Sequence, residues 1–195
     1  VAQQIVIKEE LTPGGQVETN VSITREHKGN DRSEWWYRED HRSYVKLYAP
    51  LLSEVVRTSG LWKRDRDNAR YDSNFAVHPL FKKIMESRVI STLFPGLAIS
   101  EESNRLVFGF WQKTPLGQKN TASVTYTRQV VRDWRDKGSY TFVLERQPGA
   151  TSNYRIELTA PSGFVWAESG TRLYRATLTE VPGQQLIPLT LQKNN

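Results

Sequence analysis

The chain contains no cysteine among its 195 residues. This absence excludes disulfide bonds, thiolate metal sites and thiol nucleophiles together. Other catalytic settings are missing as well, because no serine lies in a Gly-x-Ser-x-Gly motif. The three histidines, His27, His41 and His78, form neither an H-x-H nor an H-E-x-x-H pair. We therefore expect a domain that is not an enzyme, with no catalytic residue, metal ligand or cofactor.

Two groups of acidic residues could have a chemical role, in binding a metal ion or in catalysis. The run Asp65-Arg66-Asp67-Asn68 has oxygen ligands that suit Ca²⁺, but it lacks the glycine and the distal glutamate of an EF-hand loop. Glu101 and Glu102 could supply one acid of a glycosidase pair, yet adjacent residues of a strand point to opposite faces. We expect both groups to be solvated surface.

Long apolar runs and clustered charge are also missing. The most apolar stretch, near 89–99, is interrupted by Pro95 and Gly96 and is too short to cross a membrane. The net charge is +6, from 27 basic and 21 acidic residues, but the densest basic run, 128–137, contains two aspartates. Phosphate binding needs converging positive charge. We therefore expect no nucleic-acid partner.

What the chain has is alternation of apolar and polar residues. In the stretch 140–163, Tyr140, Phe142 and Leu144 alternate with polar residues, and the same pattern follows a Gln147-Pro148-Gly149 connection. This pattern predicts a β-hairpin with one buried face. Further strands are expected at 5–8, 17–24, 44–48, 52–62, 106–111, 121–127, 173–178 and 186–191, separated by Pro/Gly turns.

Strands at this spacing predict one all-β domain over 1–195, an antiparallel two-sheet sandwich of immunoglobulin- or fibronectin-like type. An insertion at about 63–103 interrupts the rhythm. A short helix is expected near 79–94, because apolar residues recur there at helical spacing between Pro79 and Pro95. The predicted core comprises Val21, Tyr44, Phe108, Phe110, Val124, Tyr126, Phe142, Leu144, Ile156 and Leu158.

Three structural motifs carry a resemblance to a known family. They are a strand that ends at Pro50 and is followed by Ser53, the segment Val107-Phe108-Gly109-Phe110-Trp111, and Gln147-Pro148-Gly149. In this order the chain resembles the C-terminal β-domain of the bacterial domain-of-unknown-function family four-thousand-and-twelve, although Leu51 and Leu52 stand at the family's glycine position. The resemblance implies a membrane-anchored, multi-part protein whose β-domain faces the outside of the cell. It implies no reaction.

The consecutive aromatic residues Trp35, Trp36 and Tyr37 are the candidate binding site. In a strand, Trp36 would point away from the other two. An exposed ring can anchor a protein partner or stack on a sugar; alternatively, the rings cover the open end of the core. We expect a non-catalytic, extracytoplasmic interaction or assembly module of a bacterial cell-envelope protein, with a carbohydrate-binding module as the alternative.

Location and assembly follow from the same expectations. The chain starts at Val1 and shows no signal peptide. We therefore expect a fragment or a processed product that is extracellular or at the cell surface, tethered through a membrane anchor outside this chain. The first predicted strand, 5–8, is short and terminal, so it is a candidate for exchange between subunits.

Overall fold

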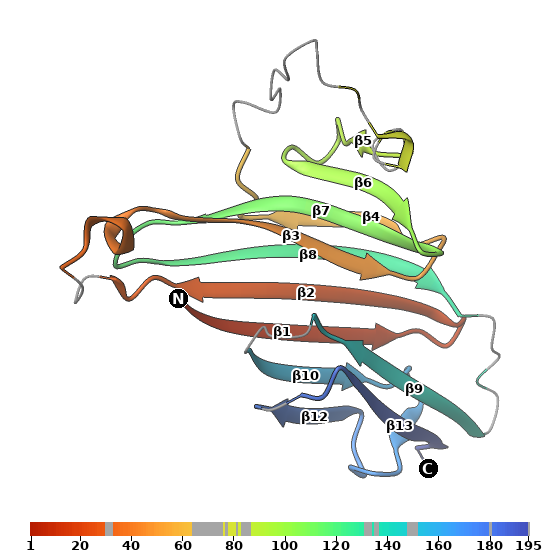
Figure 1. Ribbon diagram of the computed structural model, residues 1–195. Helices are drawn as coiled ribbons and strands as arrows, with labels where there is room; N and C mark the ends of the chain where they lie inside the picture. Colours follow the sequence, from red (N-terminus) through yellow and green to blue (C-terminus); the bar gives the residue numbers. More distant parts are fainter. Residues whose placement is uncertain are drawn as a thin grey trace.

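The structure is a computed structural model, which describes residues 1–29, 33–63, 76, 78–80, 82, 87–130, 134, 137–147, 152–179 and 181–194. The regular structure of these residues is almost entirely β-strand, arranged in three hydrogen-bonded sheets (Figure 1). The predicted all-β fold with antiparallel sheets is confirmed. Two sheets were predicted, whereas the strands form three, because one face of a single wide sheet is covered by two smaller sheets.

The largest sheet has six strands, in the order β12-β10-β1-β2-β8-β4. The bounds are β12 (Leu173–Leu178), β10 (Asn153–Thr159), β1 (Ala2–Leu11), β2 (Gln16–Glu26), β8 (Lys119–Gln129) and β4 (Glu54–Ser59). All neighbours are antiparallel except β1 and β10, which run parallel. β1 is therefore a paired interior strand of ten residues, not the short strand predicted at 5–8. Its exchange between subunits would break two rows of hydrogen bonds.

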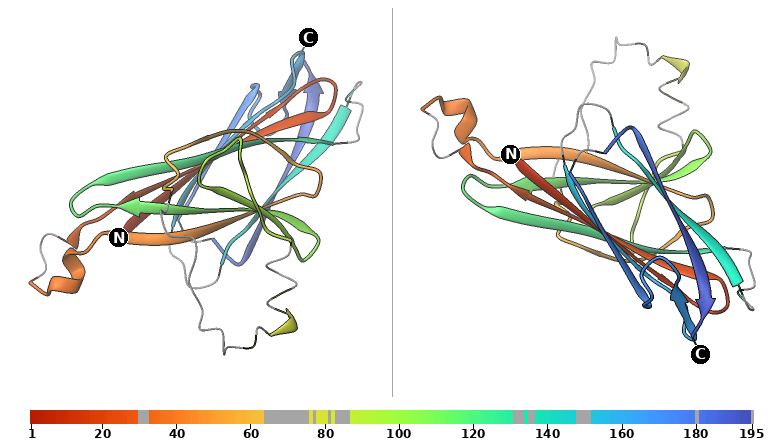
Figure 2. Two further views of the ribbon diagram at one scale, coloured as in Figure 1. Left: turned by 90° about the horizontal axis from the view of Figure 1, so that it is seen from above. Right: turned by 90° about the horizontal axis from the view of Figure 1, so that it is seen from below.

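The two smaller sheets have four and three strands. The four-stranded sheet has the order β3-β7-β6-β5, with β3 (His41–Ala49), β7 (Arg105–Thr114), β6 (Leu97–Glu102) and β5 (Val89–Ile90). The three-stranded sheet has the order β11-β13-β9, with β11 (Phe164–Trp166), β13 (Gln184–Lys193) and β9 (Lys137–Glu145). The views from above and from below in Figure 2 show that strands of different sheets run obliquely to one another, as expected for twisted sheets.

Alternation decides which face of the six-stranded sheet is buried. In β2 the odd-numbered residues from Val17 to Ile23 are buried, whereas the polar even-numbered residues from Glu18 to Thr24 lie on the more exposed face. Both smaller sheets cover the buried face. Phe108 of β7 meets Tyr126 of β8 with ring centroids 5.5 Å apart, and Tyr140 of β9 reaches Glu9 of β1. One hydrophobic cluster therefore joins all three sheets.

The predicted core is correct at nine of ten positions. The exception is Tyr44, whose residue is 37% exposed. Tyr44 lies on the outer face of the four-stranded sheet, where its ring packs over Gly109 of the neighbouring strand β7. The buried side chains among the ten are Val21, Phe108, Phe110, Val124, Tyr126, Phe142, Leu144, Ile156 and Leu158.

The stretch 140–163 does not form the predicted hairpin. β9 pairs with β13, whereas β10 pairs with β1 and β12, so the two strands belong to different sheets. Both strands alternate because each buries one face, and alternation does not identify the neighbouring strand. Residues 148–151 of the connection lie outside the described residues.

The predicted insertion at 63–103 is also different from the expectation. Pro79, Leu80 and Lys82 have helical conformation, but Val89 and Ile90 form β5 and residues 91–94 are not helical. Residues 81 and 83–86 of the predicted helix lie outside the described residues. The β-branched pair at 89–90 favours a strand, and β6 at 97–102 belongs to the four-stranded sheet. The second half of this segment is thus part of the sandwich.

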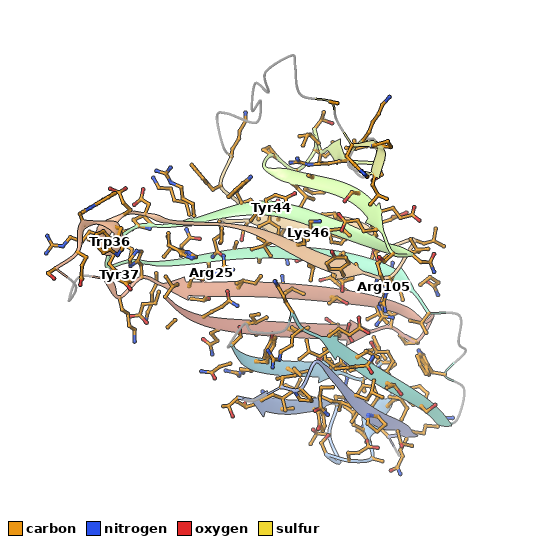
Figure 3. All side chains as sticks on the ribbon, in the orientation of Figure 1. Arg25, Trp36, Tyr37, Tyr44, Lys46 and Arg105 are labelled. Atoms are coloured by element: carbon orange, nitrogen blue, oxygen red, sulfur yellow. The ribbon has the colours of Figure 1, made fainter. Side chains whose placement is uncertain are left out.

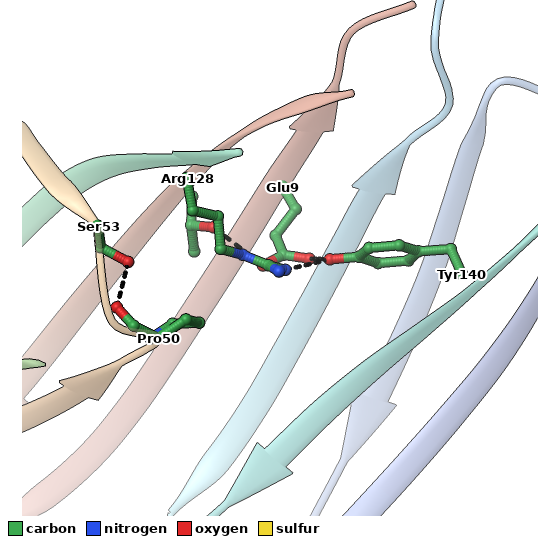
Figure 4. A network of polar contacts seen from close by, with 6 residues as sticks. Glu9, Pro50, Ser53, Arg128 and Tyr140 are labelled. Carbon is green, nitrogen blue, oxygen red and sulfur yellow. Dashed lines mark hydrogen bonds and ion pairs between the residues drawn. The ribbon is translucent and has the colours of Figure 1, made fainter. Parts of the chain in front are cut away.

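A buried polar cluster joins β9 to the six-stranded sheet (Figure 4). The Tyr140 hydroxyl donates to Glu9 Oε2, and Thr19 Oγ1 donates to Glu9 Oε1 at 2.9 Å. Arg128 Nη2 lies 3.4 Å from Glu9 Oε1 and donates to the Tyr140 hydroxyl at 2.5 Å. Burial and the negative charge of Glu9 raise the pKa of Tyr140 above its usual range, so the phenol stays a donor. Burial and the same charge raise the pKa of Tyr126 to about 12.

The Pro50–Ser53 motif forms the tight turn between β3 and β4. Ser53 Oγ donates to the Pro50 carbonyl at 2.7 Å, a bond also drawn in Figure 4. Leu52 occupies the turn with a φ of 63° and a residue exposure of 92%. This is the left-handed region, which glycine adopts without steric cost. Glycine would therefore adopt the backbone conformation of position 52 without the strain that leucine carries.

Candidate functional site

The connection between β2 and β3 carries Trp35, Trp36 and Tyr37, which we call the aromatic knob. The three residues do not form the expected strand but the first three positions of a 3-10 helix, η2 (Trp35–Arg38). They are 70%, 58% and 50% exposed, respectively. Figures 1 and 3 show η2 projecting beyond the ends of β2 and β3. The knob therefore does not cover the core, and its rings face solvent.

A buried histidine holds the base of the knob. His27, which is 7% exposed, accepts the Gly29 N–H at Nδ1 over 3.1 Å. Because Nδ1 is the acceptor, Nε2 carries the proton and donates to the Glu39 carbonyl at 2.9 Å. The backbone of His27 is bonded to the β7–β8 turn on both sides, through Gly117 and Gln118. The His27 ring and backbone thus tie both ends of the η2 segment to the sandwich.

Gly29 has a role in the same brace. A Cβ at position 29 would collide with the Tyr37 carbonyl oxygen and with the His27 ring. Tyr37 N–H in turn donates to the Glu34 carbonyl at 3.1 Å, which closes the 3-10 turn. The close backbone approach therefore fixes the direction in which the knob points.

The rings of the knob do not form one flat platform. Trp35 and Trp36 are edge to face, with centroids 5.9 Å apart and planes inclined by 81°. Trp36 and Tyr37 are 6.3 Å apart and inclined by 41°. The arrangement presents a convex group of ring edges and faces rather than a shared surface for stacking.

A second surface, which the sequence analysis did not identify, lies on the outer face of the four-stranded sheet. We call it the aromatic pocket and define it by Tyr44, Trp62, Arg88, Gly109 and Trp111. It is a half-open depression of about 330 Å³. Figure 3 places Tyr44 near the middle of β3, away from the knob at the end of the sheet. Its rim is completed by residues of the β5–β6 connection and by Lys63.

Close packing shapes the floor of the aromatic pocket. The Tyr44 and Trp111 rings lie 5.2 Å apart at 58°. A Cβ at Gly109 would collide with the Tyr44 hydroxyl, so only glycine lets this ring lie across β7. The backbone N–H of Trp62 donates to the Trp111 carbonyl at 2.8 Å and so holds the segment that carries the Trp62 ring. The one sequence signal for this site is Gly109 inside an aromatic strand, because glycine there often marks a close approach.

Of the other candidates from the sequence, Glu102 forms structural hydrogen bonds with side chains of β3, and the 65–68 run lies outside the described residues. Glu102 accepts two bonds from Lys46 Nζ, at 2.7 and 3.0 Å, and one from the Tyr48 hydroxyl at 2.9 Å. The bonds from Lys46 hold the pKa of Glu102 below its usual range. Asp65-Arg66-Asp67-Asn68 lies outside the described residues. Within the described part of the chain, no group of three or more His, Cys, Asp or Glu is placed to bind a metal ion.

Burial lowers the pKa of His41, and the positive charge of Arg25 adds to this effect.

No helix among the described residues has the length and apolar character needed to span a membrane.

Comparison of the chain with protein-family models and with curated proteins finds no match. The resemblance to family four-thousand-and-twelve therefore stays a prediction.

Proposed function

We propose that the chain is a non-catalytic interaction module that binds a protein partner through the aromatic knob. The observation that carries the proposal is the exposure of three consecutive aromatic side chains on a projecting turn. Trp and Tyr are enriched among the residues that dominate protein interfaces, because each buries a large area at low conformational cost. Exposed aromatic residues gathered in this way indicate an interaction site.

The brace around His27 supports the same proposal. A flexible loop would lose conformational entropy on binding, whereas a pre-ordered one loses less. Both ring nitrogens of His27 are bonded within the η2 segment and its neighbours. The knob is thus held in one orientation before any partner arrives.

The shape of the knob favours a protein partner over the alternative, a sugar. Stacking on a sugar ring needs an accessible flat face, and the two tryptophan planes are inclined by 81°. A convex aromatic group instead fits a hollow in another protein, where its edges and faces are both buried. A glycan array read with wild-type protein and with the Trp36→Ala variant separates the two. Specific glycan binding that falls in the variant would contradict a protein partner as the ligand of the knob.

For the setting, we propose a bacterial cell envelope, with the domain outside the cytoplasm and tethered through a segment outside this chain. The support is the resemblance described above. Protease treatment of intact cells tests it, because an external domain is degraded without lysis. Protection in intact cells and degradation only after lysis would contradict this setting.

Photo-crosslinking in the cells that naturally produce the protein tests the knob itself. A benzophenone amino acid replaces Trp36, and a matched probe replaces Leu186, which is 51% exposed on β13. The proposal predicts a discrete protein adduct from position 36 and none from position 186. No adduct from position 36, or the same adducts from both positions, would refute the proposal.

A further inference from the structure

We propose that the aromatic pocket is a second binding site, whose ligand is an acidic sugar residue of the uronic acid class. The pocket is built from four separate parts of the sequence: β3, the segment after β4, the residues around β5 and β6, and β7. The proposal rests on its rings, its charge and an unpaired guanidinium. It is independent of the knob.

The rings give the pocket aromatic walls. Tyr44 is 37% exposed, and together with Trp111 and Trp62 it lines the depression. Trp62 is attracted to two cations, Arg42 and Lys113, which lie 5.7 and 5.8 Å from its ring centroid. Ligand sites combine aromatic walls with a few polar groups that fix orientation. The volume of about 330 Å³ suits a ligand with small rings.

The charge of the lining selects an anion. Among the described residues, the lining of the pocket includes Lys63 and Arg88 but no aspartate or glutamate. A depression lined by one sign of charge concentrates ligands of the opposite sign. A neutral sugar would leave these cations without a counter-charge.

Arg88 is the residue that would meet the acid. Its guanidinium lies over the Tyr44 ring, 5.8 Å from the centroid. Its Nε is buried and has no hydrogen-bond partner, and no carboxylate pairs with Arg88 within the described part of the chain. A planar guanidinium binds a carboxylate through two parallel bonds. Stacking on Tyr44 therefore leaves the guanidinium at the pocket without an internal partner.

The hydroxyl-bearing rim completes the match to a sugar. Ser91 and Thr92 line the pocket beside Gly96, on the β5–β6 connection. Gly96 has a φ of 87°, and it packs against the segment that carries Trp62 and Lys63. Hydroxyl and ammonium groups thus surround an aromatic floor, which is the combination that a hydroxylated, carboxylated ring requires. A phosphate-bearing ligand would call for a denser group of cations than Lys63 and Arg88 provide.

The test uses oligomers of galacturonic, glucuronic and mannuronic acid, each paired with its methyl ester, and AMP as a phosphate-bearing ring ligand. Calorimetric titration is done with the wild type and with Arg88→Gln, Gly109→Ala, Tyr48→Ala and Trp36→Ala. We expect at least one free acid to bind and its ester to bind about tenfold more weakly or worse, because the ester removes the charged acceptor. Arg88→Gln should weaken the binding of the free acid by a similar factor.

The variants separate the pocket from the rest of the surface. Gly109→Ala should weaken binding by displacing the Tyr44 ring. Tyr48→Ala, outside the pocket on the same strand, and Trp36→Ala, on the knob, should bind as the wild type does. Circular dichroism checks that each variant is folded. If Gly109→Ala does not fold, the affinity of Arg88→Gln alone tests the role of the pocket. Absence of binding by all three acids, equal binding of acid and ester, an unchanged affinity in Arg88→Gln, or preferential binding of AMP would overturn the proposal.

Discussion

Tyr140→Phe tests the buried cluster that joins the three-stranded sheet to the six-stranded sheet. The substitution keeps the ring, which packs near Trp166 at 6.1 Å, and removes only the hydroxyl. That hydroxyl donates to the Glu9 carboxylate and accepts from Arg128. A hydrogen bond to a charged group contributes about 1.5–3 kcal/mol. Because Glu9 keeps Thr19 and Arg128 as partners, we expect a loss of about 2 kcal/mol.

Arg128→Met should be more damaging than Tyr140→Phe. It leaves the buried Glu9, which is 4% exposed, without its cation. Removing one partner of a buried ion pair costs about 3–5 kcal/mol. The order of the two variants therefore follows from which groups stay paired.

Urea denaturation followed by tryptophan fluorescence measures both losses as shifts in the midpoint at an unchanged slope. The matched control is Tyr48→Phe, which removes an exposed hydroxyl bonded to Glu102 at 2.9 Å. It should cost no more than about 0.5 kcal/mol. Equal effects of Tyr140→Phe and Tyr48→Phe would refute the assignment of the cluster as a link between the sheets.

Three further predictions concern the Pro50–Ser53 turn, the more exposed face of the six-stranded sheet and the knob. Leu52→Gly should raise the free energy of unfolding by about 0.5–1 kcal/mol, because it relieves a left-handed φ at an exposed position; Leu51→Gly, where φ is not positive, should lower it, and equal effects would contradict the reasoning. Hydrogen bonds from Lys8 and, to a smaller extent, from Arg155 lower the pKa of Glu157. This carboxylate therefore stabilises the fold above its pKa in the unfolded chain, about 4.3, and the stabilisation is lost as the pH falls through its lower pKa in the folded protein. Glu157→Gln should remove that acid-side step from a plot of stability against pH, and an unchanged curve would count against it. His27→Ala should speed proteolytic cleavage within 28–40, and unchanged cleavage would show that the brace is dispensable.

The sequence was sufficient to predict nine of the ten named core side chains but not which strands are neighbours. Phe142 and Ile156 were both correctly placed in the core, yet they lie in different sheets. The hydrophobic pattern constrains one face of a strand, whereas the pairing depends on contacts far apart in the chain. The parallel pairing of β1 with β10, with residues as distant as Ile7 and Ile156 in register, has no local sequence pattern that could indicate it.

The candidate sites divide in the same way. The knob was found because its residues are consecutive, although its 3-10 conformation was not predicted. The aromatic pocket was missed because Tyr44, Trp62, Arg88 and Trp111 meet only when β3, β6 and β7 pair. Tyr44 was assigned to the core, but it shares the outer face of β3 with Lys46 and Tyr48, whereas Val45 and Leu47 pack against the core. The structure shows that the outer face of that strand is also rich in aromatic and basic residues.

The central claim is that a braced aromatic knob contacts a protein partner. Photo-crosslinking from position 36 in a His27→Ala background, compared with the same probe in the otherwise unchanged protein, tests this claim most directly. Our account predicts a discrete adduct in the unchanged protein and a clearly weaker one when the brace is removed, at equal amounts of folded protein. An adduct of the same strength in both proteins would contradict the role of the brace, and the absence of any adduct would contradict the knob as the contact surface.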